Sequence, residues 1–320
     1  MSTDVESESG SMMCCCASCG IAEVDDIKLK TCTACKSVRY CSVICQREHR
    51  PQHKRACKKR AAEIRDEILF KQPESSHLGD CPICCLPLSL DDRKCTLYSC
   101  CSKLICIGCV LANYKAFREK GDMMNKITCP FCRRPMSSTK GEADSYTMKR
   151  IEVNDPVALR QMGFRRYAEG NYKGAFEYWT KAAELGDAGA HYELSHSYRE
   201  GKGGIEKDEK KAVYHLEEAA IGGHPMARNN LGCADGTNHR HDRAMKHLII
   251  AAKLGYDNSI ELLRKFHASG VVSKEDFASA LRAHQAAVDA TKSPQREEAE
   301  EFRKGALLKG EILFYETIPL

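Results

Sequence analysis

One short motif occurs three times in this chain of 320 residues, as Lys181–Gly186 (KAAELG), Glu218–Gly223 (EAAIGG) and Ile250–Gly255 (IAAKLG). Its final glycines lie 37 and then 32 residues apart. A period of this size is typical of a solenoid that stacks pairs of helices. The glycines suit a left-handed cap at the end of a helix, because they have no Cβ that would clash in that conformation.

Each motif ends a segment whose apolar residues recur at positions i, i+4 and i+7. The three stripes are Ala175/Trp179/Ala182, Ala212/Leu216/Ala219 and Ala244/Leu248/Ala251. This spacing puts the apolar side chains on one face of a helix, and alanines let a neighbouring backbone approach closely. The preceding segments share a second register, at Ala158/Met162, Ala190/Leu194 and Ala227/Leu231. We therefore predict helix pairs over 156–265, and a further amphipathic helix at Lys274–Ala290 that caps the stack.

The repeated pattern resembles the Sel-like repeat, a relative of the tetratricopeptide repeat, over about Val157–Leu263. The resemblance implies an α-solenoid that recruits protein partners. We interpret Trp179, with its neighbours Phe176 and Tyr178, as core of the helix stack rather than as a ligand cage. Cys233 falls within a repeat helix, where we expect it to act as a small buried hydrophobe.

The composition changes sharply before the repeats. Of the 20 cysteines, 19 fall in positions 14–132, and Cys233 is the other one. The start of the chain, Met1–Gly10 (MSTDVESESG), lacks the basic residues and apolar stretch of a secretory signal. We therefore expect reduced thiols in the cytoplasm or nucleus. No run approaches the roughly 18 apolar residues that a membrane helix requires, so we expect no membrane partner.

The first cysteine block carries eight soft ligands in four close pairs. They are Cys16, Cys19, Cys32, Cys35, Cys41, Cys45, His53 and Cys57. Two tetrahedral Zn2+ ions need such a set, because each ion takes four ligands and a short loop supplies two. The block has few apolar residues, so metal binding should supply most of its folding free energy, on the order of 10 kcal/mol per ion. Cys14 or Cys15 is an alternative to Cys16. His49 is the other available imidazole, which we interpret as a surface histidine.

With Tyr40-Cys41-Ser42, Cys45-Gln46 and His53-Lys54, this block closely resembles the MYND zinc finger over Cys16–Cys57. That family interleaves its pairs, which implies one ion on Cys16, Cys19, Cys41 and Cys45 and another on Cys32, Cys35, His53 and Cys57. Family members commonly grip short proline-containing peptides, which implies a peptide contact at Gln46. Arg50 occupies the place where the family has an aromatic residue.

The second cysteine block contains three Cys-x2-Cys pairs, Cys81/Cys84, Cys106/Cys109 and Cys129/Cys132, with Cys101 between the first two. This arrangement resembles a RING-type zinc finger over Cys81–Pro135. In that family the first and third pairs share an ion, which implies a complete site on Cys81, Cys84, Cys106 and Cys109. The other site then has Cys101, Cys129 and Cys132.

The sequence does not identify the eighth ligand of the second block. Lys103 stands where the family has a His or Cys, and an ammonium group has no lone pair to donate. Cys100 is the preferred substitute, and Cys95, Cys85 and His77 are alternatives. A three-ligand ion with a bound water would be a catalytic metal instead. The chain has no His-Glu-x-x-His motif, so we expect a structural site and about four Zn2+ ions in all.

RING-type fingers typically act as ubiquitin-protein ligases without a nucleophile of their own. They hold the thioester of a ubiquitin-charged conjugating enzyme in a reactive pose, which is catalysis by positioning. The resemblance implies three docking residues, Ile83, Pro130 and Arg133. A guanidinium suits such a contact because its planar fork bonds carbonyls of two partners at once. Alternatively, Ile83 and Pro130 pack the turns between ligands and Arg133 is solvated.

Three classes of function are therefore in competition. The first is a RING-type ligase whose MYND-type finger and repeats recruit substrate, and the second is a zinc-stabilised adaptor without catalysis. The third is a nucleic-acid co-regulator, suggested by Lys28–Arg60, which has eleven Lys/Arg and the single acid Glu48. Tyr40 is the only aromatic residue there, whereas nucleic-acid binders interleave stacking aromatics. We interpret this basic patch as a solvated face and expect protein partners. No free cysteine has a recognisable catalytic signature.

The fold class that follows is multidomain, with two small cross-brace zinc-binding α+β domains followed by an all-α solenoid of helix pairs. The predicted segments are a disordered tip (1–13), a MYND-type finger (14–60), a helical linker (61–79), a RING-type finger (80–135), a linker (136–155), repeats (156–265), a capping helix (266–290) and a tail (291–320).

Overall fold

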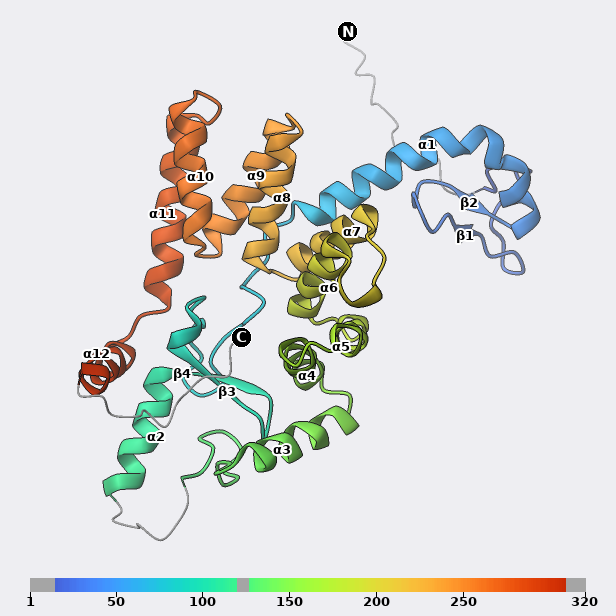
Figure 1. Cartoon of the computed structure of the whole chain (residues 1–320). Coiled ribbons are helices and arrows are strands. Elements are labelled where there is room, and N and C mark those ends of the chain that lie inside the picture. Colours follow the sequence, from blue (N-terminus) through green and yellow to red (C-terminus); the bar gives the residue numbers. More distant parts are fainter. Residues whose placement is uncertain (1–14, 120–126, 309–320) are drawn as a thin grey trace. The chain divides into compact units, whose positions relative to one another are not determined.

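A computed structural model describes residues 15–119 and 127–308 of the chain. The predicted tip, Cys14 and the last part of the predicted tail lie outside the described residues. The chain divides into two compact units, Met1–Lys71 and Gln72–Leu320 (Figure 1).

The first unit consists of a small hairpin and one long helix. Strand β1 (Lys30–Thr31) pairs antiparallel with β2 (Arg39–Tyr40), and α1 (Val43–Leu69) follows. The side chain of Ser42 caps α1 by accepting a hydrogen bond from the backbone N–H of Cys45 at 3.2 Å. Apart from Leu29 and Tyr40, the buried residues that pack together around the hairpin are cysteines. The predicted ligands are therefore also most of the core.

The second unit begins with a finger built on a hairpin and a helix. Its elements are η1 (Asp92–Lys94), β3 (Cys95–Tyr98), β4 (Lys103–Cys106) and α2 (Ile107–Glu119). The strands are antiparallel, with Cys95 opposite Cys106. Leu88, Ile105 and Val110 are buried among the cysteines and form a small apolar core.

The helix pairs of the solenoid stack in chain order (Figure 1). They are α4 (Pro156–Ala168), α5 (Tyr172–Glu184), α6 (Ala188–Glu200), α7 (Glu209–Ile221), α8 (Pro225–Thr237) and α9 (His241–Lys253), with η2 (Lys202–Gly204) in one connection. All nine residues of the three predicted stripes are buried. Gly186, Gly223 and Gly255 have φ angles of 87°, 81° and 85°, so the predicted left-handed caps are confirmed.

Four more helices flank the pairs, namely α3 (Lys140–Glu152), α10 (Asp257–Ala268), α11 (Lys274–Ala290) and α12 (Pro294–Leu308). The predicted bounds of α11 are confirmed. Two of the others differ from the prediction, because α3 lies in the segment interpreted as a linker and α12 in the segment interpreted as a tail. Both sequences are rich in charged residues, and neither contains the motif that repeats in the solenoid. Side-chain caps mark their starts instead. The backbone N–H of Glu142 donates to the hydroxyl of Thr139 (3.2 Å), and that of Arg296 donates to the hydroxyl of Ser293 (3.3 Å).

Two single-residue predictions in the solenoid have opposite outcomes. Trp179 is 2% exposed and its indole N–H donates to the carbonyl of Arg160 at 3.3 Å, which confirms its core role. Cys233 is exposed, so the prediction of a buried thiol was wrong. It lies on α8, on a face that the neighbouring helices leave open to solvent. Within 15–119 and 127–308, none of the helices is long and apolar enough to span a bilayer.

The segment that precedes the second finger packs against the repeats. The backbone N–H of His77 donates to the carbonyl of Gly223 at 3.0 Å. Its imidazole stacks on that of His224, with ring centroids 4.1 Å apart. The finger and the solenoid thereby belong to one unit.

Candidate metal centres

Four Cys-x2-Cys turns in the two fingers fold in the same way. In each turn the residue after the second cysteine has a φ between 53° and 76°, and its N–H donates to the carbonyl of the first cysteine at 2.8–2.9 Å. These closing residues are Gly20, Lys36, Cys85 and Arg133. The closed turn holds two thiols of each pair near one point, which is what a tetrahedral ion requires from a short loop.

The first finger brings its eight predicted ligands into two clusters. They are Cys16/Cys19/Cys41/Cys45 and Cys32/Cys35/His53/Cys57, each with its ligand atoms within 4.8 Å of one another. The pairs interleave as the MYND resemblance implies. The hairpin supplies the Cys32/Cys35 turn and Cys41, whereas Cys45, His53 and Cys57 project from α1. Since His53 and Cys57 are four residues apart on a helix, they share one face.

The spacing of the ligand atoms fits Zn2+. Tetrahedral coordination with Zn–S bonds of about 2.3 Å separates two sulfur atoms by about 3.8 Å. Seven Sγ–Sγ pairs in the four clusters are 3.4 to 4.0 Å apart, and all ligand atoms of a cluster lie within 4.8 Å of one another. The Sγ of Cys35 and the Nε2 of His53 are 3.3 Å apart. A disulfide would bring two sulfurs to about 2.05 Å, and all the described cysteines are free.

His49 differs from its interpretation as a surface histidine. Its ring is stacked on that of the predicted ligand His53, with centroids 5.5 Å apart and planes 10° from parallel. Its Nδ1 lies 3.1 Å from the hydroxyl of Tyr40, which is 3% exposed. Burial raises the pKa of Tyr40. His49 thus packs against a ligand ring from outside the cluster and helps to orient it. In the sequence, the four-residue spacing of His49 and His53 indicates that the two rings share a helix face.

The second finger forms two further clusters, Cys81/Cys84/Cys106/Cys109 and Cys100/Cys101/Cys129/Cys132, which also interleave. In the first, Cys84 and Cys106 have sulfurs 3.7 Å apart across the finger. Cys106 ends β4 and Cys109 lies in the first turn of α2, so the strand-to-helix junction supplies both. Donor sets made only of thiols are typical of structural zinc sites.

Cys100 lies at the place of the open eighth ligand. It is 7% exposed, and its Sγ is 3.4 Å from that of Cys132. Cys100 and Cys101 reach the same cluster because the turn between β3 and β4 is tight, with the N–H of Ser102 donating to Tyr98 at 2.8 Å. Lys103 instead lies with its ammonium 5.8 Å from the centre of the Phe131 ring.

The other candidates for that ligand lie elsewhere. The buried thiol of Cys95 faces the carbonyl of Ser89 at 3.6 Å, and burial raises its pKa to about 12. Cys85 is exposed and closes the turn after Cys84. His77 is engaged with the repeats.

The pKa values within a cluster move in opposite directions. A hydrogen bond from Cys106 lowers the pKa of Cys81 to about 4, whereas burial raises the pKa of Cys109 in the same cluster to about 12. In the first finger, a hydrogen bond with Cys45 raises the pKa of Cys41 to about 12. Neighbouring thiolates therefore resist ionising together, and a divalent ion replaces their protons when it binds. Zinc bound here supplies folding free energy to both fingers.

The residues predicted to contact partners occupy accessible positions. Ile83 is 41% exposed, Pro130 is half-buried and Arg133 is exposed. Phe131, for which the sequence motifs indicated no role, is 44% exposed beside Pro130. Gln46 is half-buried in the first turns of α1.

Comparisons with known proteins identify two parts of the chain. The MYND finger family matches residues 16–57, and the Sel1 repeat family matches 156–187, 188–224 and 225–256. No curated protein matches the chain. The chain thus contains a MYND finger and a run of Sel1 repeats, and it is a zinc-binding protein with protein-interaction modules.

Two of the solved structures that resemble the chain are Sel1-type proteins. One is a Sel1 repeat protein from Oxalobacter formigenes, with 28% identity and a TM-score of 0.41 over 48% of this chain and 66% of that one. Another is c5321, a protective antigen present in uropathogenic Escherichia coli strains that displays an SLR fold, with 21% identity and a TM-score of 0.40 over 47% and 34%. The chain spans less than two thirds of the length of either.

Proposed function

We propose that this chain is a RING-type ubiquitin-protein ligase that recruits its substrates through the MYND finger and the Sel1 repeats. The observation that carries the proposal is the second finger itself. Two interleaved four-cysteine clusters surround a β-hairpin and a helix. The turns that enclose the clusters carry Ile83 and Pro130 at the positions that the RING resemblance assigns to docking.

A ligase of this kind needs a rigid platform rather than a nucleophile. Positioning a thioester for attack depends on holding the partner within about 0.5 Å of a productive geometry. Ile83 lies between two predicted ligands, Cys81 and Cys84, so a bound ion would fix its backbone on both sides. Its side chain nevertheless remains 41% exposed and available to a partner. The backbone N–H of Arg133 donates to the carbonyl of Cys129, which fixes the backbone at this position. The side chain of Arg133 is exposed, so its guanidinium is available to a partner.

The test is autoubiquitination by the zinc-loaded full chain with activating enzyme, ATP and a panel of conjugating enzymes. We expect ubiquitin chains with at least one conjugating enzyme, and a loss of at least about tenfold in rate for Ile83→Ala. Val153→Ala is the matched control, because Val153 is an exposed aliphatic residue (64%) at the end of α3, outside the finger. Its rate should equal that of the wild type.

Two results would contradict the ligase proposal. One is the absence of ubiquitin chains with every conjugating enzyme tested, which would leave the chain a zinc-stabilised adaptor. The other is equal activity of Ile83→Ala and Val153→Ala, because docking through the finger requires the exposed isoleucine.

For the MYND finger, the proposal specifies recruitment of short proline-containing peptides. Val43, the first residue of α1, lies one turn before Gln46 on the same helix face and is 59% exposed. An exposed apolar side chain next to a side-chain amide suits a peptide, because the peptide offers apolar side chains for packing and backbone groups for hydrogen bonds. Fluorescence anisotropy with labelled proline-containing peptides tests this. Val43→Asp should weaken binding at least about tenfold, whereas Ile68→Asp, at an exposed position near the other end of α1, should not.

A further inference from the structure

Helix α12 packs against the second finger, although about 160 residues of sequence separate α12 from the end of the finger. It lies beside α2, as Figure 1 shows. Lys94 of η1 forms an ion pair with Glu300 at 2.7 Å, and Lys115 of α2 forms another with Glu298. Farther along α12, the guanidinium of Arg303 donates to the carbonyl of Arg93 at 3.1 Å. The C-terminal helix is therefore docked on the finger through several independent contacts.

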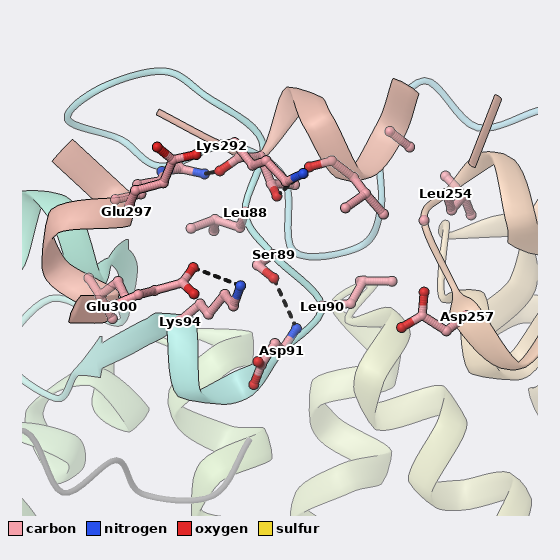
Figure 2. Close-up of a pocket in the computed structure, with 16 residues that line it drawn as sticks. Leu88, Ser89, Leu90, Asp91, Lys94, Leu254, Asp257, Lys292, Glu297 and Glu300 are labelled. Carbon is pink, nitrogen blue, oxygen red and sulfur yellow. Dashed lines mark hydrogen bonds and ion pairs between the residues drawn. The ribbon is translucent and has the colours of Figure 1, made fainter. Parts of the chain in front are cut away.

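Figure 2 shows this junction from the side of a cavity of about 230 Å³. Leu88, Ser89 and Leu90 of the finger form one wall, and Glu297 and Glu300 of α12 line another. Glu300 points toward Lys94 across the gap. The cavity contains both charge signs, and its walls belong to three different parts of the fold.

Arg296 is the residue of α12 that reaches deepest into the finger. It is 6% exposed. One nitrogen of its guanidinium, Nη1, donates to the carbonyls of Pro87 (2.6 Å) and Thr291 (2.7 Å). The other, Nη2, donates to the carbonyl of Leu86 at 3.1 Å and to the Sγ of Cys84 at 3.3 Å. The guanidinium thus contacts a predicted zinc ligand directly.

The sequence of α2 provides the space for this contact. A Cβ placed on Gly108 would lie 3.0 Å from both the Cγ and the backbone N of Arg296. Any larger residue at 108 would press on α12. Gly108 directly precedes the predicted ligand Cys109, so the close approach of α12 occurs at the cluster itself.

The charges explain why a buried arginine is favourable here. Four thiolates around Zn2+ carry a net charge of −2, and burial makes an uncompensated charge costly. The acceptors that Arg296 reaches are neutral carbonyls and one sulfur, and none of these is a carboxylate. The cluster and the guanidinium therefore supply the compensating charge for each other, and a hydrogen bond to sulfur makes the thiolate a weaker target for protons and electrophiles.

We propose that Arg296 is an outer-shell partner of the zinc centre formed by Cys81, Cys84, Cys106 and Cys109, and that this contact latches α12 to the finger. Loading of that centre then strengthens the docking of the C-terminal helix, beyond what its other contacts with the finger provide. Loss of zinc lets the four thiolates take up protons, which removes the negative charge that faces the guanidinium and weakens the docking of α12. The inference does not depend on ligase activity.

The first experiment measures zinc release from the full chain into a chromophoric chelator, with simultaneous thiol alkylation read by mass spectrometry. In Arg296→Gln, we expect one of the four ions to leave at least about tenfold faster, and Cys81, Cys84, Cys106 and Cys109 to be alkylated first. Arg303→Gln is the control, because it removes a contact of α12 with the finger that involves no ligand. Its release should match the wild type. Arg296→Lys, which keeps the charge but loses the fork, should be intermediate.

The second experiment uses Gly108→Ala, which leaves Arg296 intact but pushes it away. We expect the same selective release, together with faster hydrogen exchange in α12. Wild-type release from both variants would overturn the proposal. Equal acceleration in Arg296→Gln and Arg303→Gln would also overturn it, because the effect would then come from helix packing rather than from the contact with Cys84.

Discussion

At the scale of single residues, Cys100 completes the second finger. It is adjacent to Cys101, and both reach one cluster because the turn between β3 and β4 is tight. The sequence reduced the eighth ligand to four candidates, since Lys103 cannot coordinate a metal. It could not select among them, because the choice depends on where the hairpin turns. Cys95 offers the same thiol ligand as Cys100, but its thiol faces the carbonyl of Ser89 instead of the cluster.

Replacing Cys100 should therefore empty one centre. We expect Cys100→Ala to lower the bound zinc from about four ions to about three per chain, because three thiols bind structural zinc much more weakly than four. Cys95→Ala is the control and should keep four, since its thiol faces a carbonyl outside the clusters. Elemental analysis of the desalted proteins measures both. Four ions in Cys100→Ala would show that another group is the eighth ligand.

His77 predicts a pH dependence. Burial lowers its pKa to about 3, and burial also lowers that of the stacked His224 well below the usual value. The Nδ1 of His77 is shielded and has no hydrogen-bond partner among the described residues. An unfolded chain has a histidine pKa near 6.5, so below that pH the unfolded state binds more protons. The stability that neutral His77 provides is full above pH ~6.5 and declines as the pH falls toward 3.

The measurement is the melting temperature of the wild type and of His77→Phe between pH 7.5 and 5.5. Phenylalanine keeps the stacking on His224 but does not titrate. Acid weakens zinc binding in both proteins, so their difference isolates the histidine. The wild type should lose stability relative to the variant by up to about 1.4 kcal/mol per pH unit below 6.5. A constant difference over this range would contradict the account.

At the scale of elements, α4 and α5 are held together by a close approach at Gly163. A Cβ on Gly163 would lie 2.3 Å from the Nε1 of Trp179, so the indole would have to move. We expect Gly163→Ala to destabilise the solenoid by about 1–3 kcal/mol in chemical denaturation. Gly305→Ala, in α12 with nothing near its Cβ, should instead stabilise by up to about 1 kcal/mol, because alanine favours helix. Equal effects would mean that helix propensity, not packing, decides.

The elements differ in how far the sequence predicts them. The helix pairs were predictable, because alanine stripes and capping glycines such as Gly186 recur every 32 to 37 residues. Each helix also packs mainly on the helices next to it in the chain, so local patterns carry the signal. Helices α3 and α12 were not, because their sequences are polar and neither contains the repeated motif. The contact of Arg296 with Cys84 joins residues 212 positions apart, and no local pattern indicates such a pair.

At the scale of the whole molecule, zinc and packing stabilise different regions. The core of the first finger is mostly cysteine, whereas the buried stripes of the repeats are alanine, leucine and tryptophan. We expect a strong chelator to abolish hydrogen-exchange protection in the fingers, at 16–57 and 81–132. Protection in α5, α7 and α9 should persist, because these helices bury apolar area without metal. Loss of protection in the repeats at the same rate would show that their fold depends on zinc.

The central claim is that four clusters of four ligands each hold one Zn2+ ion. Native mass spectrometry of the full chain, purified without added chelator, tests it most directly, because each bound ion adds a resolved mass. The account predicts a dominant species with four zinc ions, which falls to three in Cys100→Ala. A saturated wild-type chain with three or fewer ions would contradict the ligand assignment.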